Sequence, residues 1–321
     1  MHRLMSAFLS LALVLAGTRV HAAEYPPVDV PVRAVQIGPH SYYVPGLAGA
    51  ASADNQGFMS NAGFVITPAG VVVFDALGTP SLAQAMLAEI RKLTQAPIRR
   101  VLVSHFHADH YYGLQVFKDA GAEIWAHVNA QGATRSLAAR LRFEQRKEVL
   151  QPWVSDELQR FIEADVWLEG DVDFELGGVR FLVRHVGPAH SPEDLALFVA
   201  DDGVLYAGDL VFKGRVPFVG EADSRLWLAS LEKLLALAPR VLVPGHGQAS
   251  LEPAQDLGLT RDYLRYLREQ MGRAVADLVP FEEAYRNTDW SRYEHLPAFA
   301  EANRVNAYNT YILMERESLG P

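Results

Sequence analysis

The chain has 321 residues, about half of them hydrophobic and about a fifth charged, and its formal net charge is −9 at pH 7. This length and composition indicate an ordinary globular protein with a large buried core. The acidic balance argues against a nucleic-acid partner, and without cysteine the chain forms neither disulfides nor thiolate metal sites.

Residues 1–22 have the pattern of a signal peptide. His2 and Arg3 open a short basic region, an apolar run follows from Ala7 to Gly17, and Val20-His21-Ala22 offers the small residues that a signal peptidase requires. The apolar run is too short to span a bilayer comfortably, and no later segment approaches the apolar length of a membrane span. We predict cleavage after Ala22 and export to the periplasm; cleavage after Ala23 and a retained N-terminal anchor are the alternatives.

Strands rich in Val, Ile and Phe are predicted at 33–43, 61–67 and 71–75, and apolar residues at helical spacing predict a helix from Ser81 to Leu93. The small, polar segment from Gly46 to Gly57 is expected to be a loop that acts as a flap over a pocket. Asp75 ends the third strand. It is expected either to orient a metal-ligating histidine or to serve as a turn residue.

Four residues of metal-binding type follow the apolar run Val101-Leu102-Val103. They are His105, His107, Asp109 and His110, within six consecutive positions. In extended chain, residues two apart share a face, so the first three are predicted to project together and His110 to reach a second point. Because so short a segment cannot wrap all four around one tetrahedral ion, the spacing predicts two neighbouring metals.

The region after this motif predicts a helix at 112–120, a strand at 123–126, a charged helix at 129–150 and a further short helix at 154–161. His127 is expected to be a core or rim histidine, because no other ligand type accompanies it. The charged helix is expected to present a solvated outer face. Its basic residues are Arg135, Arg140, Arg142, Arg146 and Lys147.

Three further residues of metal-binding type follow apolar strands in the second half of the chain. His190, Asp209 and His246 each lie in a glycine-rich or proline-rich turn. Each alone is typical of a turn residue. Together with the first cluster they predict one site, because side chains at strand ends along one edge of a sheet stack converge.

The C-terminal part is predicted to be helical at 257–276, 280–287 and 297–317. We therefore expect a domain at 23–252 and a helical extension at 253–321 that packs on it. The aromatic residues of the extension are expected to pack internally or to form a homodimer contact, and less readily to line a pocket. They are Tyr293, Phe299, Tyr308 and Tyr311.

The pattern His-x-His-x-Asp-His at 105–110, followed in order by His190, Asp209 and His246, resembles the metallo-β-lactamase superfamily over residues 32–251. The resemblance implies an α+β fold, the αββα sandwich, to which the C-terminal helices are an extension. It also implies two Zn²⁺ ions per chain. The first is held by His105, His107 and His190, the second by Asp109, His110 and His246, and Asp209 bridges them.

Asp209 indicates which subgroup of the superfamily the chain resembles. The commonest true β-lactamases have cysteine there, and another lactamase subclass lacks the bridging aspartate. An aspartate-bridged pair is instead similar to thioesterases of the glyoxalase II type and to broad hydrolases. The segments 107–115 and 208–218 resemble an exported SoxH-like subgroup, the quinoprotein relay system zinc metallohydrolases.

The resemblance implies hydrolysis of an ester, thioester, lactone or amide-type bond in a small molecule by a metal-bridging hydroxide, with Asp109 as the catalytic carboxylate. Lys213 and Arg215 are expected to bind a substrate carboxylate or to form a solvated pair, and Tyr111 to line the pocket or to pack. The alternatives are weak or secondary β-lactamase activity, an iron-dependent redox enzyme and a non-catalytic periplasmic accessory.

Overall fold

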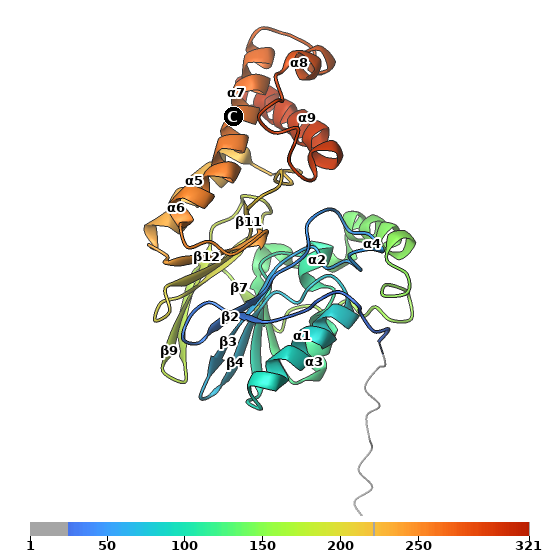
Figure 1. Cartoon of the computed structure of the whole chain (residues 1–321). Coiled ribbons are helices and arrows are strands. Elements are labelled where there is room, and N and C mark those ends of the chain that lie inside the picture. The colour runs from blue at the N-terminus through green and yellow to red at the C-terminus, as the bar shows by residue number, and fades with distance from the viewer. Residues whose placement is uncertain (1–24, 221, 321) are drawn as a thin grey trace, which may run out of the picture.

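The structure, a computed structural model, describes residues 25–220 and 222–320, so the predicted signal peptide at 1–22 lies outside the described residues. Two β-sheets face each other, and helices cover the outer face of each (Figure 1). The expected αββα sandwich with C-terminal helices is therefore confirmed.

The first sheet has seven strands in sequence order, antiparallel from β1 to β4 and parallel from β4 to β7. Its strands are β1 (Val35–Gln36), β2 (Ser41–Val44), β3 (Ala62–Thr67), β4 (Gly70–Phe74), β5 (Ile98–Leu102), β6 (Glu123–His127) and β7 (Val166–Leu168). The second sheet has the order β12-β11-β10-β9-β8. Its strands are β8 (Val172–Leu176), β9 (Val179–His185), β10 (Leu195–Val199), β11 (Val204–Phe212) and β12 (Val241–His246).

Helices fill the connections and the C-terminal part. They are α1 (Pro80–Leu93), α2 (Ala108–Tyr111), α3 (Leu114–Asp119), α4 (Leu137–Val149), α5 (Ser224–Ala236), α6 (Pro253–Asp256), α7 (Gly258–Ala276), α8 (Phe281–Asn287) and α9 (Phe299–Ser318). No helix in the described part of the chain is long and apolar enough to cross a membrane.

Alternation along the strands produces three apolar layers. On β4, Val71 and Val73 pack under the helices of the first sheet, whereas Val72 and Phe74 pack between the two sheets. On β11, Tyr206 packs between the sheets. Because successive side chains of a strand point to opposite faces, strands covered on both sides read as continuous apolar runs.

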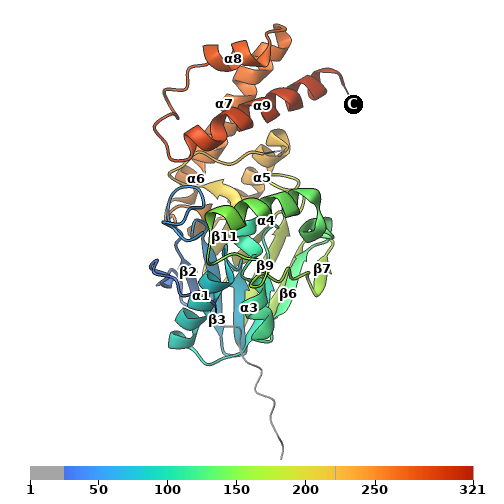
Figure 2. The ribbon, with the colours of Figure 1, turned by 90° about the vertical axis from the view of Figure 1, so that its right-hand side faces the viewer.

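The C-terminal helices build on the second sheet. Helix α7 contacts α5 and β11, and α8 and α9 pack on α7 (Figures 1 and 2). Tyr293 and Tyr311 are buried in this core, whereas Tyr308 is about half exposed. The predicted homodimer contact stays a prediction.

Three predicted elements are wrong in detail. The strand expected at 33–43 is the short hairpin β1–β2, because Gly38 and Pro39 interrupt it. The helix expected at 154–161 is turns and irregular chain, and the one expected at 129–150 is two single 3₁₀ turns followed by α4. Of the three residues expected in turns, Asp209 lies inside β11 and His246 is the last residue of β12, whereas His190 lies in a loop.

Candidate metal centre

The seven predicted metal ligands lie at one end of the sandwich and come from four separate segments of the chain. His105 and His107 follow β5, while Asp109 and His110 lie on the one-turn helix α2. The expected alternation therefore ends at His107, which precedes the first residue of this helix. His190 lies in the β9–β10 loop, Asp209 in β11, and His246 ends β12.

A β-bulge aims the Asp209 carboxylate at the cluster. The pairing of β11 with β12 shifts register on both sides of Gly208, where φ is 54°. A Cβ at Gly208 would lie 2.8 Å from Cβ of Ser104. Glycine is therefore needed both for the left-handed backbone and for the close approach of the two sheets.

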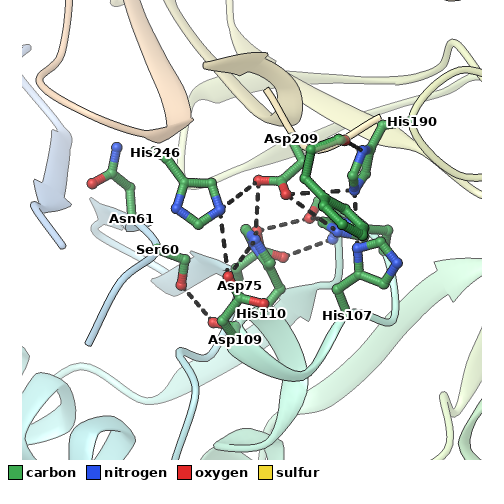
Figure 3. A network of polar contacts seen from close by, with 12 residues as sticks. Ser60, Asn61, Asp75, His107, Asp109, His110, His190, Asp209 and His246 are labelled. Carbon is green, nitrogen blue, oxygen red and sulfur yellow. Dashed lines mark hydrogen bonds and ion pairs between the residues drawn. The ribbon is translucent and has the colours of Figure 1, made fainter. Parts of the chain in front are cut away.

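The structure brings all seven predicted ligands together in two groups. Figure 3 labels each of them except His105. One group joins His105, His107 and His190 to Asp209, and the other joins Asp109, His110 and His246. Within each group the candidate ligand atoms lie within 4.8 Å of one another. Their role as ligands stays a prediction, and the distances, hydrogen bonds and burial of these side chains support it.

The two carboxylate oxygens of Asp209 face different histidines. Oδ2 lies 3.4 Å from Nε2 of His190 and 3.8 Å from Nε2 of His105. Oδ1 lies 3.1 Å from Nε2 of His110 and 3.2 Å from Nε2 of His246. Donors bound to one tetrahedral ion at about 2.0–2.1 Å lie roughly 3.3–3.5 Å apart, so this spacing suits a bridging carboxylate.

The remaining donors complete the two groups. Nδ1 of His107 lies 2.9 Å from Nε2 of His190. Oδ2 of Asp109 lies 3.4 Å from Nε2 of His246 and 3.6 Å from Nε2 of His110. Thus His107 presents its Nδ1 atom to the cluster, whereas the other four histidines present Nε2.

The opposite ring nitrogens are held by hydrogen bonds. Nδ1 of His190 donates to the Phe218 carbonyl at 2.9 Å, and Nδ1 of His246 donates to the Met59 carbonyl at 2.7 Å. Since a protonated Nδ1 leaves Nε2 with its lone pair free, each carbonyl fixes the tautomer that a metal requires.

Asp75 holds two more ligands through one carboxylate. It accepts hydrogen bonds from Nδ1 of His110 at 2.8 Å, from the Ser104 amide at 2.7 Å and from the Ser104 hydroxyl at 2.8 Å. Oγ of Ser104 in turn lies 2.9 Å from Nδ1 of His105. Asp75 has a left-handed backbone with φ of 61°, which turns its carboxylate from the end of β4 toward the cluster.

Burial sets the charge of most of the histidines. It lowers the pKa of His105, His107 and His190, that of His107 to about 3, so these imidazoles are neutral. Burial also opposes charge on His110, but the carboxylates of Asp209, Asp109 and Asp75 outweigh it and raise the pKa of His110 well above its ordinary value.

The carboxylates of the cluster remain ionised. Burial would raise the pKa of Asp209, but His246 and His110 overcome it and hold this pKa well below its usual range. The same two histidines lower the pKa of Asp109 to about 2 against the effect of burial. Anionic oxygens beside the neutral imidazoles of His105, His107 and His190 form a donor set suited to divalent metal, and a metal would take the place of the proton that the carboxylates favour on His110.

Unpartnered buried atoms test whether a metal fits. Nε2 of His105, Nε2 of His110 and Oδ1 of Asp209 are buried, and none makes a well-oriented hydrogen bond in the described chain. The polar atoms near them belong to other predicted ligands, as in the 3.1 Å approach of Nε2 of His110 to Oδ1 of Asp209. Unpaired buried polar atoms are costly, and here all three point at the cluster. A metal ion would satisfy each of them, so the residues fit two ions.

Two of the predicted substrate-binding residues lie near the cluster and one does not. Tyr111 lines the adjoining cavity, and burial raises its pKa. Arg215 is buried beside His246 and donates to the Gly49 carbonyl of the predicted flap at 3.2 Å. Lys213 instead pairs with Asp256 of α6 and is absent from the cavity wall, so this geometry gives its predicted role no support.

Other residues of the site were not predicted. Ser104 and the carbonyls of Met59 and Phe218 position ligands, but backbone partners leave no signature in a sequence. The expectation that α4 presents only a solvated face is wrong, because Arg142 lines the cavity and Arg146 is buried.

The chain is similar in sequence to a known protein family and to several known proteins. The family model described as "Metallo-beta-lactamase superfamily" matches residues 55–246. A linear primary-alkylsulfatase of Pseudomonas sp. (strain ATCC 19151) is 27% identical over 240 residues, which cover 64% of this chain and 45% of that protein. The chain therefore spans about half the length of this relative.

Two further matches differ in coverage. The metallo-beta-lactamase type 2 of Elizabethkingia meningoseptica is 24% identical over 251 residues, which cover 77% of this chain and 89% of that protein. The structure of a stereoselective inverting sec-alkylsulfatase from Pseudomonas sp. matches with a TM-score of 0.65 at 16% identity and covers 90% of this chain and 52% of that one. At this identity the structural match shows the fold alone.

Proposed function

From the premise that the chain belongs to the metallo-beta-lactamase superfamily, we propose that it is an exported hydrolase that holds two zinc ions. Its substrate is a small molecule with an ester, thioester, lactone or amide-type bond. Residues 23–252 form the catalytic domain and residues 253–321 an extension packed on it. The similarity of segments 107–115 and 208–218 supports the SoxH-like subgroup within this proposal.

One observation carries the proposal. Each oxygen of the Asp209 carboxylate faces a different pair of histidine Nε2 atoms, at 3.1–3.8 Å. This is the arrangement expected of a carboxylate between two ions. His105, His107 and His190 would hold the first ion, and Asp109, His110 and His246 the second. Two zinc ions would supply an activated water at neutral pH and polarise the scissile bond.

The chain's own residues perform the remaining steps. Asp109 stays ionised and lies beside both His110 and His246, so its carboxylate is placed to orient the attacking water and to accept its proton. Water adds to the acyl carbon, the bond to the leaving group breaks, and Asp109 returns the proton to that group. Asp75 and the two carbonyls keep the imidazole rings in place throughout.

A second candidate is cleavage of an alkyl sulfate ester. The similarity to the linear primary-alkylsulfatase, which extends over 64% of this chain, favours it. The chain spans about half of that relative, so alkyl sulfates belong among the substrates to be assayed.

A substrate panel tests the proposal. The purified mature protein, loaded with two equivalents of zinc, is assayed with thioesters, lactones, carboxylic esters, β-lactams, phosphodiesters and alkyl sulfates. Turnover of an acyl substrate, with two zinc ions per chain by elemental analysis, is the expected result. Iron with oxygen uptake in protein from the native host, or no turnover of any substrate by the dizinc protein, would overturn it.

Fractionation tests the proposed export. A bacterial host that produces the full chain is separated into periplasm and cytoplasm, and the N-terminus of the periplasmic protein is sequenced. We expect it to begin at Ala23. A cytoplasmic protein that retains Met1 would contradict export.

A further inference from the structure

A cavity of about 600 Å³ adjoins the metal cluster on the side of His107 and His190. Its walls come from the segment 106–112, α4, the β9–β10 loop, the β11–α5 loop and α9. Helix α4 covers the end of the sandwich nearest to the C-terminal helices in both views (Figures 1 and 2). A cavity of this volume holds a small molecule.

One face of α4 forms part of the cavity wall. Ser136, Ala139 and Arg142 line the cavity at successive spacings of three residues, and Arg146 follows one turn later. Residues three and four apart lie on the same side of a helix. The two arginines therefore share the face that is turned toward α2 and the metal cluster.

The guanidinium groups of this face differ from the other basic groups of α4 in their partners. Lys147, on the other side of the helix, pairs with Glu144 and Asp156. For Arg142 and Arg146, by contrast, no side-chain hydrogen bond or ion pair is found within residues 25–220 and 222–320. Arg146 is only 9% exposed. The carboxylate of Asp109 in the metal cluster acts on the charge of Arg146. Arg142 instead faces the cavity and is paired with no carboxylate of the described chain, so its guanidinium is placed to receive an anion from the cavity.

The acidic side chains of the cavity do not neutralise the arginines. Burial raises the pKa of Glu193, whose Oε1 accepts a hydrogen bond from the Phe106 amide. The Asp223 carboxylate caps the N-terminus of α5 by accepting from the amides of residues 225 and 226. Both carboxylates are thus engaged by the protein.

We infer that Arg142, supported by Arg146 one turn behind it, binds an anionic group of the substrate at the wall of the cavity beside His107. The group is a carboxylate or a sulfate, since both match the fork of a guanidinium. The apolar part of the substrate lies against Phe106, Phe218 and Val305. This inference rests on the proposed hydrolase and assigns the class of its substrate: an anionic amphiphile.

Matched esters test the subsite by turnover. Mono-4-nitrophenyl glutarate carries a carboxylate, whereas 4-nitrophenyl butyrate is neutral and of similar length. We expect Arg142→Gln to raise KM for the glutarate ester about tenfold or more and to leave KM for the butyrate ester unchanged, because a charge-assisted hydrogen bond is lost. Arg142→Lys should restore part of the loss, since lysine keeps the charge without the fork.

The matched control is Arg140→Gln, an arginine on the exposed side of the same helix. It should change KM for neither ester. An equal rise for both esters with Arg142→Gln, or the same rise with Arg140→Gln, would overturn the subsite. Hexyl sulfate distinguishes the two anions: if it is hydrolysed, the bound group is the reacting sulfate, and if only the glutarate ester is hydrolysed, it is a pendant carboxylate.

Binding without turnover separates the subsite from the proposed function. By calorimetry, glutarate and butanesulfonate should bind the dizinc wild-type protein at least about ten times more tightly than Arg142→Gln, and more weakly as salt increases. Butanol should show no difference between the two proteins. If the wild-type protein hydrolyses nothing, the proposed function fails while these titrations still decide the subsite. If neither anion binds, the subsite fails even when esters are hydrolysed.

Discussion

The metal cluster and the α4 wall of the cavity lie side by side, yet they differ in how their polar groups are held. In the cluster, Nδ1 of His110, His190 and His246 each contacts a fixed oxygen within 3 Å. On α4, the guanidinium groups of Arg142 and Arg146 have no such partner within the described ranges. The protein itself orients the side chains of the metal cluster, whereas the arginines of α4 are expected to gain a partner when an anionic substrate binds.

This difference separates the chemistry from the specificity. Ligands held by a second set of hydrogen bonds give a site of fixed geometry, as activation of water requires. On the cavity wall, Arg142 makes no ion pair within the described chain and is left to recognise the substrate. Changes in the cluster should therefore affect every substrate, whereas changes on α4 should affect only anionic ones.

Removal of metal should produce the largest effect. Extended dialysis against a strong chelator should abolish hydrolysis of neutral and anionic esters alike. It should also lower the free energy of unfolding by about 4 kcal/mol for each ion lost, relative to protein at a thousandfold excess of zinc over its Kd. Calorimetric melting and activity, with zinc added back as the control, measure this. An unchanged Tm would mean that the cluster is organised without metal.

Asp209→Asn should come next. The amide removes the charge and places an N–H₂ group against one pair of Nε2 atoms, so the zinc content should fall from two to one or none. We expect kcat/KM to fall by about 10²–10³-fold or more for both esters. Asp202→Asn is the matched control, because this buried aspartate precedes the same strand but pairs with His40. Retention of two zinc ions in Asp209→Asn would refute a bridging role.

Asp75→Asn should have an intermediate effect. Its carboxylate accepts three hydrogen bonds, and an amide can accept at only one of its two positions. We expect zinc affinity or activity to fall by about 10–100-fold, as is usual for residues that orient metal ligands. Competition with a chromogenic chelator measures the affinity. An unchanged affinity would indicate that Asp75 is a turn residue only.

Lys213→Met should have the smallest effect and provides a contrast with Arg142. Its partner Asp256 lies on α6, and both side chains are partly exposed. The loss should lower the free energy of unfolding by no more than about 1 kcal/mol. KM for the anionic ester should not change. A rise comparable to that of Arg142→Gln would move the anion subsite from α4 to the loop after β11.

The sequence was sufficient to predict the layers of the fold and the residues that gather at its edge. Alternating apolar strands and side chains at strand ends follow simple rules, which is why His190 and His246 could be grouped with His105 from sequence alone. The partners of these histidines could not be predicted, because Met59 and Phe218 contribute only backbone carbonyls.

The surroundings of Arg142 and Arg146 could not be predicted for a different reason. A charged helix is usually solvated on its polar face, and nothing in its composition says that α4 borders a cavity to which residues of α9 also contribute. Lys213 and Arg215 show the same limit, since two residues separated by one glycine end in opposite environments. Facing direction around a loop depends on tertiary contacts that residue types do not encode.

The Asp75 carboxylate touches ligands of both groups: His110 directly, and His105 through Ser104. An ion that orders one of these rings also fixes the carboxylate that orients the other. We therefore expect zinc uptake to be positively cooperative, so that titration with substoichiometric zinc yields mainly empty and fully loaded chains and few with one ion. The left-handed backbone of Asp75 at the end of β4 would then determine how a limited amount of zinc is distributed among the protein molecules.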